Sequence, residues 1–323
     1  MFDYENFKSK IFSIQPENFQ INALEVFAYQ YFHNPTYQIY CQHLGKSPDN
    51  VHSLQDIPFL PIEFFKTHQV MTGQWEPEKV FMSSGTTGMQ RSEHHVRDLS
   101  FYHQIAQVIF ESHYGPLPSI EIMALLPSYL EQGDSSLISM VDHFMRHSHP
   151  SSAYYLGDHS FLRQAINSSD RKKLLIGVSY ALLDVTDETR LSADNLIIME
   201  TGGMKGRRKE MIRTELHEVL MKNFSASHIH SEYGMTELTS QAYAVEGQFA
   251  FPPWARALIR DINDPFTFLP AGRTGGLNII DLANINSCSF LETKDLGLES
   301  KTGHFEVLGR FDNSDVRGCN LLV

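Results

Sequence analysis

Hydroxyl side chains and glycines concentrate in one short segment, residues 81–91, which reads FMSSGTTGMQR. Glycine lets the backbone approach a ligand closely, and hydroxyls together with exposed N–H groups donate hydrogen bonds to phosphate oxygens. The segment therefore predicts a phosphate-binding loop, although such loops also occur as plain solvated turns. It is not a P-loop, because the sequence GxxxxGK followed by Ser or Thr is absent. The candidate phosphate-binding residues are Ser83, Ser84, Gly85, Thr86, Thr87 and Gly88.

A second chemically distinctive segment, residues 230–237, reads HSEYGMTE. Tyr233 offers a flat aromatic face to a ring-shaped ligand, and Thr236 offers a hydroxyl. Glu237 offers a hard carboxylate oxygen, the kind of ligand that Mg²⁺ accepts beside phosphates. The same pattern also fits a strand end followed by a capped helix, so the segment alone does not decide between a site and a structural element.

The composition narrows the class of protein. The 38 acidic residues outnumber the 26 basic ones, giving a formal net charge of -12, so nucleic acid and anionic lipid are repelled at long range. Three cysteines, Cys41, Cys288 and Cys319, show no metal-ligand spacing. No signal peptide and no run of about 18 uncharged apolar residues is present. We therefore expect a cytoplasmic protein with no nucleic-acid partner and no membrane association.

The elements that must position these segments alternate between strands and helices. Aromatic residues recur every three or four positions over residues 2–12 and 23–34, which predicts two helices. Continuous apolar runs at residues 120–126, 174–178 and 196–199 predict strands buried on both faces of a parallel sheet. The sequence therefore indicates an α/β fold.

From residue 252 the sequence changes to shorter alternating segments with Gly and Asp turns, which suggests a smaller β-rich subdomain. We expect residues 1–250 to form an α/β core that carries the phosphate loop. Residues 251–312 would form the β-rich subdomain of the same large domain. Residues 313–323 would form a short C-terminal tail that carries Cys319.

Five motifs in order resemble those of the adenylate-forming superfamily, which includes acyl-CoA synthetases and luciferases. Residues 81–91 resemble its phosphate loop, and residues 230–237 resemble its YGxTE motif. The second resemblance implies that Tyr233, Gly234 and Thr236 contact the bound nucleotide.

The other three motifs follow in the same order. Residues 200–206, ETGGMKG, look like the superfamily's adenine-side loop, with Gly202 and Gly203 inside it. Asp295 stands where the superfamily has the aspartate that binds the ribose hydroxyls. Arg310, in the sequence GRFD, resembles the arginine of its GRxD hinge.

Within the superfamily, the sequences SSGTTG and ETGGMKGR and the ending DVRGCNLLV most resemble the acyl-protein synthetases of bacterial fatty-acid reductase complexes. The resemblance covers roughly residues 50–323. It implies the fold of the superfamily's large N-terminal domain, with layered α/β sheets and a small β-rich subdomain. Because the chain stops 11 residues after Asp312, it also implies that the mobile C-terminal domain is missing or vestigial.

The resemblance implies a two-step ligase reaction. A carboxylic acid, expected to be a fatty acid, attacks the α-phosphorus of ATP to give an acyl-adenylate and pyrophosphate, and a thiol then accepts the acyl group. Ser84, Thr86 and Thr87 would hold phosphates, and Glu237 would hold Mg²⁺. The acceptor would be Cys319, coenzyme A or a partner protein, such as an acyl-CoA or fatty-acid reductase or an acyl carrier.

Adenylate-forming enzymes usually carry a catalytic lysine in the mobile domain, and that lysine has no counterpart here. Lys205, in the cationic run KGRRK, could supply the cation near the α-phosphate, since a fixed positive charge would do similar work. The run also fits a solvated basic helix start. A partner protein could equally supply the charge.

Two other functional hypotheses remain open on the sequence. Ser179 follows a strand in the pattern G-x-S-x-A, close to the nucleophile elbow of an α/β-hydrolase, and Asp194 and His228 could complete a triad. Alternatively, the chain is a catalytically degenerate nucleotide-binding scaffold of an acyl-transfer complex. An intact Thr86, Thr236 and Glu237 argue against the scaffold.

Overall fold

The computed structural model of the protein describes residues 3–84, 90–127, 133–157, 159–188, 195–202 and 211–310. Its α-helices in these ranges are α1 (Tyr4–Lys10), α2 (Phe19–His33), α3 (Pro35–His43), α4 (Phe64–Thr67), α5 (Leu99–Tyr114), α6 (Ser136–His147), α7 (His159–Ile166), α8 (Ser179–Glu188) and α9 (Arg213–Phe224). Short 3₁₀ turns are η1 (Ile11–Ser13), η2 (Leu54–Asp56) and η3 (Leu117–Ser119).

The strands in the same ranges are β1 (Leu60–Pro61), β2 (Lys79–Met82), β3 (Glu93–Val96), β4 (Ile120–Leu125), β5 (Ala153–Tyr154), β6 (Lys172–Val178), β7 (Leu196–Thr201), β8 (His230–Tyr233), β9 (Ala242–Val245), β10 (Gln248–Ala250), β11 (Ala255–Arg260), β12 (Thr274–Asp281), β13 (Phe290–Glu299) and β14 (Phe305–Arg310). Strands β2 and β3 form an antiparallel hairpin of their own. The other strands join one mixed sheet in the order β11-β12-β13-β14-β10-β9-β8-β7-β6-β4-β5, with β1 paired to β13.

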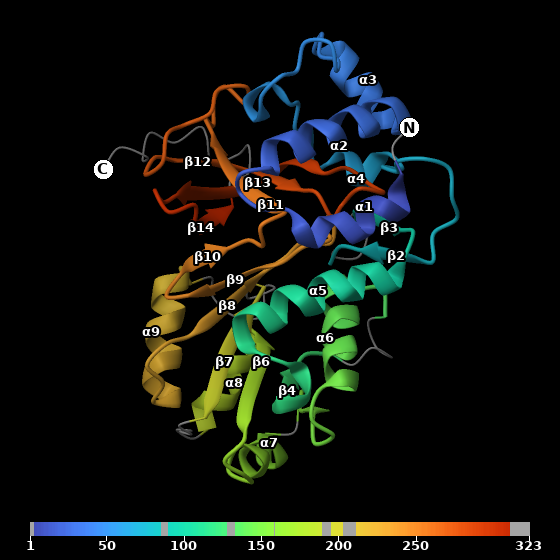
Figure 1. The fold of residues 1–323 in the computed structure, drawn as a ribbon. Coiled ribbons are helices and arrows are strands. Elements are labelled where there is room, and N and C mark those ends of the chain that lie inside the picture. Colours follow the sequence, from blue (N-terminus) through green and yellow to red (C-terminus); the bar gives the residue numbers. More distant parts are fainter. Residues whose placement is uncertain are drawn as a thin grey trace.

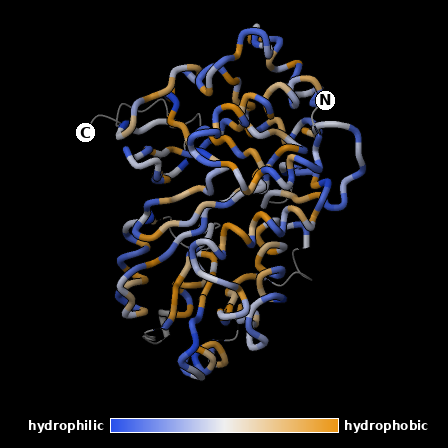
Figure 2. The backbone as a smooth tube through the Cα atoms, in the orientation of Figure 1, coloured by the Kyte–Doolittle hydropathy of each residue, from blue (hydrophilic) through white to orange (hydrophobic). Residues whose placement is uncertain are grey.

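The parallel half of the sheet forms the lower part of the molecule in Figure 1, where α5 to α9 surround β4, β6, β7 and β8. Every residue of Ile120–Leu125 is buried, and β6 and β7 are largely buried as well. Figure 2 shows the apolar colour along these strands. The strands predicted from continuous apolar runs are therefore confirmed, as is the α/β class.

Gly177, the glycine of the pattern that resembles a nucleophile elbow, lies within β6 and has a packing role. A Cβ atom at this position would lie 2.9 Å from the Cβ atom of Leu125 on the neighbouring strand β4. The glycine is thus needed for close packing of β6 against β4 and the start of α8.

The two predicted N-terminal helices exist, with different ends. The first ends at Lys10 and continues as a 3₁₀ turn, and the second begins at Phe19. Pro35 begins a further helix, α3, because its missing N–H is not needed at the first position and Asn34 caps that end by accepting from the Tyr37 N–H at 3.0 Å. Across the described ranges, no helix combines the length and the apolar content that crossing a membrane requires.

The β-rich end of the chain forms antiparallel strands β11 to β14, as predicted, and helices α1 to α3 lie beside them in the upper part of Figure 1. The buried side chain of Gln30 joins these distant segments. Its Nε2 donates to Ser289 Oγ at 3.2 Å, and its Oε1 accepts from the Ser289 N–H at 2.9 Å. The division of the chain at residues 250 and 312 stays a prediction.

Candidate functional site

The base of the Ser/Thr/Gly loop is the β2–β3 hairpin. The Ser83 N–H donates to the Ser92 carbonyl at 3.0 Å, and the Ser92 N–H donates to Ser83 Oγ at 2.8 Å. Arg91 donates to the Ser83 carbonyl and pairs with Asp134 at 2.9 Å. Ser84 is exposed at the end of the described segment. These contacts hold both ends of the loop, whose predicted residues Gly85, Thr86, Thr87 and Gly88 lie outside the described ranges.

The second segment lies directly against this hairpin. His94, on β3, donates from Nδ1 to the Thr236 carbonyl at 2.8 Å across 142 residues of sequence. Burial lowers the pKa of His94 to about 4, so its ring is neutral. Ser92 hydrogen-bonds to the Glu237 side chain. The structure therefore brings the base of the predicted phosphate loop to Thr236 and Glu237.

Glu237 occupies a buried position with a fixed backbone. The residue is 6% exposed, and burial raises the pKa of its carboxyl above the usual range. Asn284 Nδ2 donates to the Glu237 carbonyl oxygen at 2.8 Å. A carboxylate held in this way, with hydroxyls close by, is a donor set that suits Mg²⁺ when substrate phosphates complete its coordination. In the part of the chain that the structure describes, no three His, Cys, Asp or Glu side chains form an all-protein metal site.

Gly234, the glycine of the second segment, directly follows β8 and is exposed. A Cβ atom at this position would lie 2.5 Å from Glu232 Oε1 and 3.4 Å from the Cγ atom of Gln241. A side chain there would therefore require the buried Glu232 carboxyl to move. This packing against Glu232 explains the glycine without a ligand, so the predicted contact of Gly234 with the nucleotide stays a prediction.

Tyr233, Asp295 and Arg310 form a second predicted group that the structure brings together. Tyr233 Oη donates to Asp295 Oδ2 at 2.7 Å, and Arg310 Nε lies 3.3 Å from Asp295 Oδ1. Burial raises the pKa of the Asp295 carboxyl, although the hydrogen bond from Tyr233 and the charge of Arg310 oppose this shift. The Tyr233 ring is buried with its edge contacts to Phe249 and Phe305.

The adenine-side segment begins at the end of β7. Gly202 has φ of +69°, a conformation that favours glycine, and its carbonyl accepts from Ser179 Oγ at 2.7 Å. Thr201 Oγ1 donates to Glu232 Oε2 at 2.5 Å and so ties the end of β7 to β8. Gly203 and Lys205 lie outside the described ranges.

Arg213 is a cation of this region that sequence reasoning missed. Its Nε lies 3.0 Å from Glu200 Oε1, and its NH1 donates to the Val307 carbonyl at 3.0 Å. The guanidinium also stacks 4.9 Å from the centre of the Phe249 ring. Arg213 therefore links the strand before the adenine-side loop to β14, near Asp295. Its position at the first residue of α9 gives no sequence signal, since its partners Glu200 and Val307 lie on the distant strands β7 and β14.

Asp281 and Asn284 were also missed. Asp281 Oδ2 accepts from the Thr239 N–H at 2.9 Å and from the Ser240 N–H at 2.7 Å. Asn284 Oδ1 accepts from Thr239 Oγ1 at 3.1 Å. These two residues fix the chain that follows Glu237. Only the polar pair in an otherwise apolar stretch, DLANI, could have drawn attention to them.

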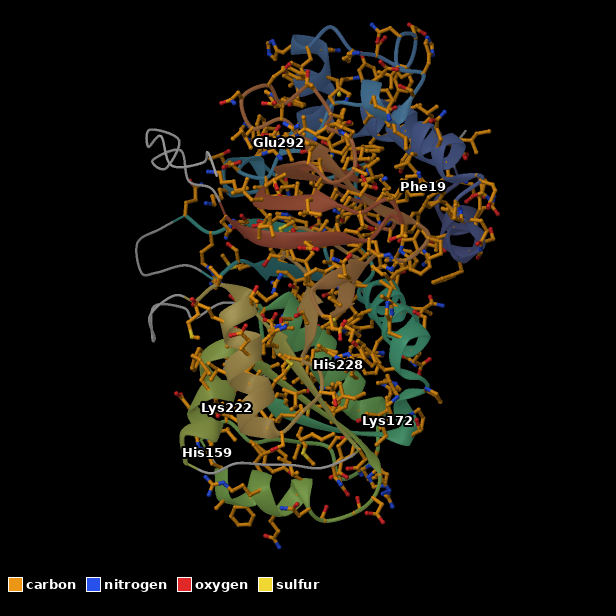
Figure 3. All side chains as sticks on the ribbon, turned by 90° about the vertical axis from the view of Figure 1, so that its left-hand side faces the viewer. Phe19, His159, Lys172, Lys222, His228 and Glu292 are labelled. Carbon is orange, nitrogen blue, oxygen red and sulfur yellow. The ribbon has the colours of Figure 1, made fainter. Side chains whose placement is uncertain are left out.

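The remaining candidate nucleophiles divide into two groups. Cys41 and Cys288 are buried free thiols, and burial raises the pKa of Cys41 to about 12, so both suit structural roles, as predicted. Cys319 lies outside the described ranges. Ser179 donates its hydroxyl to Gly202, whereas His228 lies at the surface and pairs with Glu246 at 2.7 Å (Figure 3). Ser179 and His228 thus have partners other than each other, and Asp194, the third residue of the possible triad, lies outside the described ranges.

Glu232 gives the first testable expectation. Burial raises the pKa of its carboxyl from 4.5 to about 7. Between pH 4.5 and about pH 7, Glu232 is ionised in the unfolded chain but still protonated in the folded chain. The free energy of unfolding therefore falls as the pH rises through this range, by roughly 3 kcal/mol in total. Glu232→Gln should flatten this part of the profile, measured by urea unfolding between about pH 5 and about pH 8. An unchanged slope in the variant would contradict the assignment.

Known proteins of one family resemble this chain over almost its whole length. Residues 7–323 match the family described as "Acyl-protein synthetase, LuxE". The chain is 26% identical over 329 residues to the long-chain-fatty-acid–luciferin-component ligase of Vibrio harveyi, covering 91% of this chain and 84% of the relative. It is 26% identical over 332 residues to the ligase of the same name from Aliivibrio fischeri, covering 92% and 85%.

Solved structures of similar fold include a ligase and an ATP-bound protein. A 2-hydroxyisobutyryl-CoA ligase in complex with its acyl-adenylate and CoA aligns with a TM-score of 0.68 at 14% identity, covering 96% of this chain and 69% of that one. ATP-bound MatB from Rhodopseudomonas palustris aligns with a TM-score of 0.55 at 15% identity, covering 86% and 58%. The predicted adenylate-forming fold is confirmed. The chain belongs to the LuxE family of acyl-protein synthetases, as the resemblance of its motifs implied.

Proposed function

We propose that this protein activates a carboxylic acid with ATP to form an acyl-adenylate and then passes the acyl group to a thiol. One observation carries the proposal. The base of the hydroxyl-rich loop contacts Glu237 through Ser92 and Thr236 through His94, so the described ends of the predicted phosphate-binding loop lie beside a candidate metal-binding carboxylate. The Tyr233–Asp295 pair beside them supports a nucleotide ligand.

In the first step, a carboxylate oxygen of the acid forms a bond to the α-phosphorus, and the bond from that phosphorus to the β-phosphate bridging oxygen breaks. The leaving pyrophosphate takes the bonding electrons. Ser83, Ser84 and the glycines and threonines that follow would hold the phosphates by hydrogen bonds. Glu237 would hold Mg²⁺, which when bound neutralises charge on the phosphates.

Asp295 and Arg310 would orient the nucleotide. The Asp295 carboxylate would accept hydrogen bonds from the ribose hydroxyls, and Tyr233 fixes its orientation at 2.7 Å. Gly202 and Gly203 would border the adenine ring, and Gly234 would leave the nucleotide room beside the end of β8. The cation that stabilises the α-phosphate would come from Lys205 or from a partner protein.

In the second step, a thiolate sulfur attacks the acyl carbon, the carbon–oxygen bond to the phosphate breaks and AMP leaves. The thiol would belong to Cys319, coenzyme A or a partner protein. The names of the relatives favour a long-chain fatty acid as the substrate. If the acceptor is a partner protein, it would be an acyl reductase or an acyl carrier. The free buried thiols of Cys41 and Cys288 favour a reducing compartment, the cytoplasm.

A screen of carboxylic acids for ATP-dependent pyrophosphate release, run with and without coenzyme A, tests this function. We expect release with straight-chain fatty acids and label transfer from radioactive acid to the protein as a hydroxylamine-sensitive thioester. The Cys319→Ser variant should release pyrophosphate but lose the protein-bound label. Equal labelling of the variant would exclude Cys319 as the acceptor. ATP binding without release for any acid would instead favour a scaffold.

A further inference from the structure

A cavity whose lining contains none of the predicted nucleotide-binding residues lies in the upper part of the molecule. It has a volume of about 250 Å³ and opens between α3, the segment that follows it and the loop between β11 and β12. Aromatic side chains form much of its wall, and Glu292 of β13 is its carboxylate on the sheet side. Figure 3 places Glu292 far from His228 and Lys222. The aromatic residues are Tyr40, Phe59, Phe266 and Phe268.

Two contacts hold the aromatic wall in place, and one of its rings is exposed. Tyr40 Oη donates to the Phe59 carbonyl at 2.9 Å. The Phe59 ring contacts the Phe268 ring edge to face, with centres 5.8 Å apart. Phe266, at 62% exposure, is among the most exposed large apolar side chains of the described ranges. The cavity therefore has a preformed apolar interior, and the exposed Phe266 is available to cover a bound molecule.

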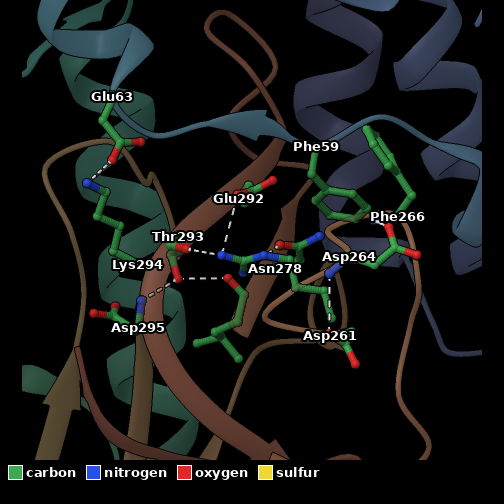
Figure 4. Close-up of polar contacts among 12 residues, drawn as sticks. Phe59, Glu63, Asp261, Asp264, Phe266, Asn278, Glu292, Thr293, Lys294 and Asp295 are labelled. Atoms are coloured by element: carbon green, nitrogen blue, oxygen red, sulfur yellow. Dashed lines mark hydrogen bonds and ion pairs between the residues drawn. The ribbon is translucent and has the colours of Figure 1, made fainter. Parts of the chain in front are cut away.

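Glu292 supplies a carboxyl group to the cavity and forms a long ion pair with the buried Arg260. Its Oε1 lies 3.4 Å from Arg260 NH2, longer than a hydrogen bond. Arg260 is committed elsewhere, because NH1 donates to Asn278 Oδ1 at 3.1 Å and NH2 donates to the Thr293 carbonyl at 2.8 Å. Figure 4 shows Glu292, Asn278 and Thr293 close together among the polar contacts of this region.

Among the described residues that line the cavity, Lys46 is the one with a positive charge, and it already has an acidic neighbour. Its Nζ lies 3.7 Å from Asp56 Oδ1. The described lining thus carries two carboxylates, those of Asp56 and Glu292, against one ammonium group. A carboxylate beside the faces of several aromatic rings is the combination that recognises organic cations.

We propose that this cavity binds an organic ammonium ion whose apolar body has the size of an aromatic ring with a short chain. The ammonium group would donate to Glu292, and the body would pack against Phe59, Phe266 and Phe268. A cavity of about 150 Å³ holds a benzene molecule, so the larger volume here leaves room for a ring, a short chain and the charged group. The site is distinct from the nucleotide site, because Tyr233, Glu237 and Asp295 do not line it.

Calorimetric titration of the full chain with 2-phenylethylammonium tests the proposal. We expect saturable binding with one site per chain, and binding of the neutral 2-phenylethanol and of 3-phenylpropionate at least about tenfold weaker. Glu292→Gln should weaken binding of the ammonium ion by about tenfold or more, since the charge-assisted hydrogen bond is lost. Glu299→Gln, on the same strand outside the cavity, is the matched control and should bind as the unmodified chain does.

A second pair of variants keeps the test independent of Glu292, whose loss could disturb Arg260. Phe266→Ala should weaken binding severalfold, whereas Phe32→Ala, at an equally exposed phenylalanine of α2, should have no effect. Equal affinity for the ammonium ion and 2-phenylethanol would overturn the proposal and leave a merely apolar cavity. The absence of saturable binding in the millimolar range would also overturn it, whatever the ligase assay gives.

Discussion

Glu237→Gln is expected to abolish carboxylic-acid-dependent exchange between ATP and pyrophosphate, with a loss of roughly 100-fold or more. Glutamine keeps the size of the side chain and an oxygen that can accept the hydrogen bond from Ser92. It removes the negative charge, which is the property that a divalent cation beside the phosphates requires. The measurement is the exchange rate at saturating ATP and acid, over a range of Mg²⁺ concentrations.

The Mg²⁺ dependence separates loss of the metal ligand from general damage. If Glu237 holds the metal, the residual activity of the variant should need much more Mg²⁺ for saturation, while thermal unfolding without nucleotide changes little. Glu299→Gln serves as a control, because this carboxylate lies on β13 and interacts with Arg256 instead of the site. Undiminished exchange in Glu237→Gln would remove Glu237 from the reaction, even if the protein still proved to be an acyl-activating ligase.

The parallel half of the fold could be predicted well from local sequence. The runs that became β4, β6 and β7 are apolar without alternation, which is the direct consequence of burial on both faces. Helix ends were less predictable. Pro35 directly follows the predicted helix over residues 23–34, where proline is expected after a helix end, but proline is also well suited to begin a helix, and here it begins α3.

Packing between distant segments could not be predicted. Gln30 pairs with Ser289 across 259 residues, and nothing near Gln30 in the sequence marks it as buried. In the site, the resemblance pointed to Tyr233 and Asp295, and the structure joins them by a hydrogen bond across 62 positions. Arg213 was missed because its partners come from β7 and β14, and no spacing rule in the sequence connects those strands.

Asp281→Ala is expected to lower the free energy of unfolding by about 4 kcal/mol, because four donors would lose a fully buried acceptor. Asp281 is 0% exposed, and its carboxyl accepts from the N–H groups of Thr239, Ser240 and Ala283 and from Ser240 Oγ. Ser240 Oγ in turn accepts from Trp254 Nε1 at 2.9 Å. Urea unfolding followed by tryptophan fluorescence measures the loss, since Trp254 is a direct neighbour of this cluster.

The same substitution should also weaken the ligase reaction, because the cluster fixes the chain directly after Glu237. Asp261→Ala is the matched control: its carboxyl also accepts from two backbone N–H groups, those of Asn263 and Asp264, but in an exposed turn where water can replace it. Asp261→Ala should lower the free energy of unfolding by less than about 1 kcal/mol. If Asp281→Ala lowered the free energy of unfolding by no more than Asp261→Ala does, the buried Asp281 carboxyl would not be what holds Thr239 and Ser240. Other contacts would then have to fix the position of Glu237.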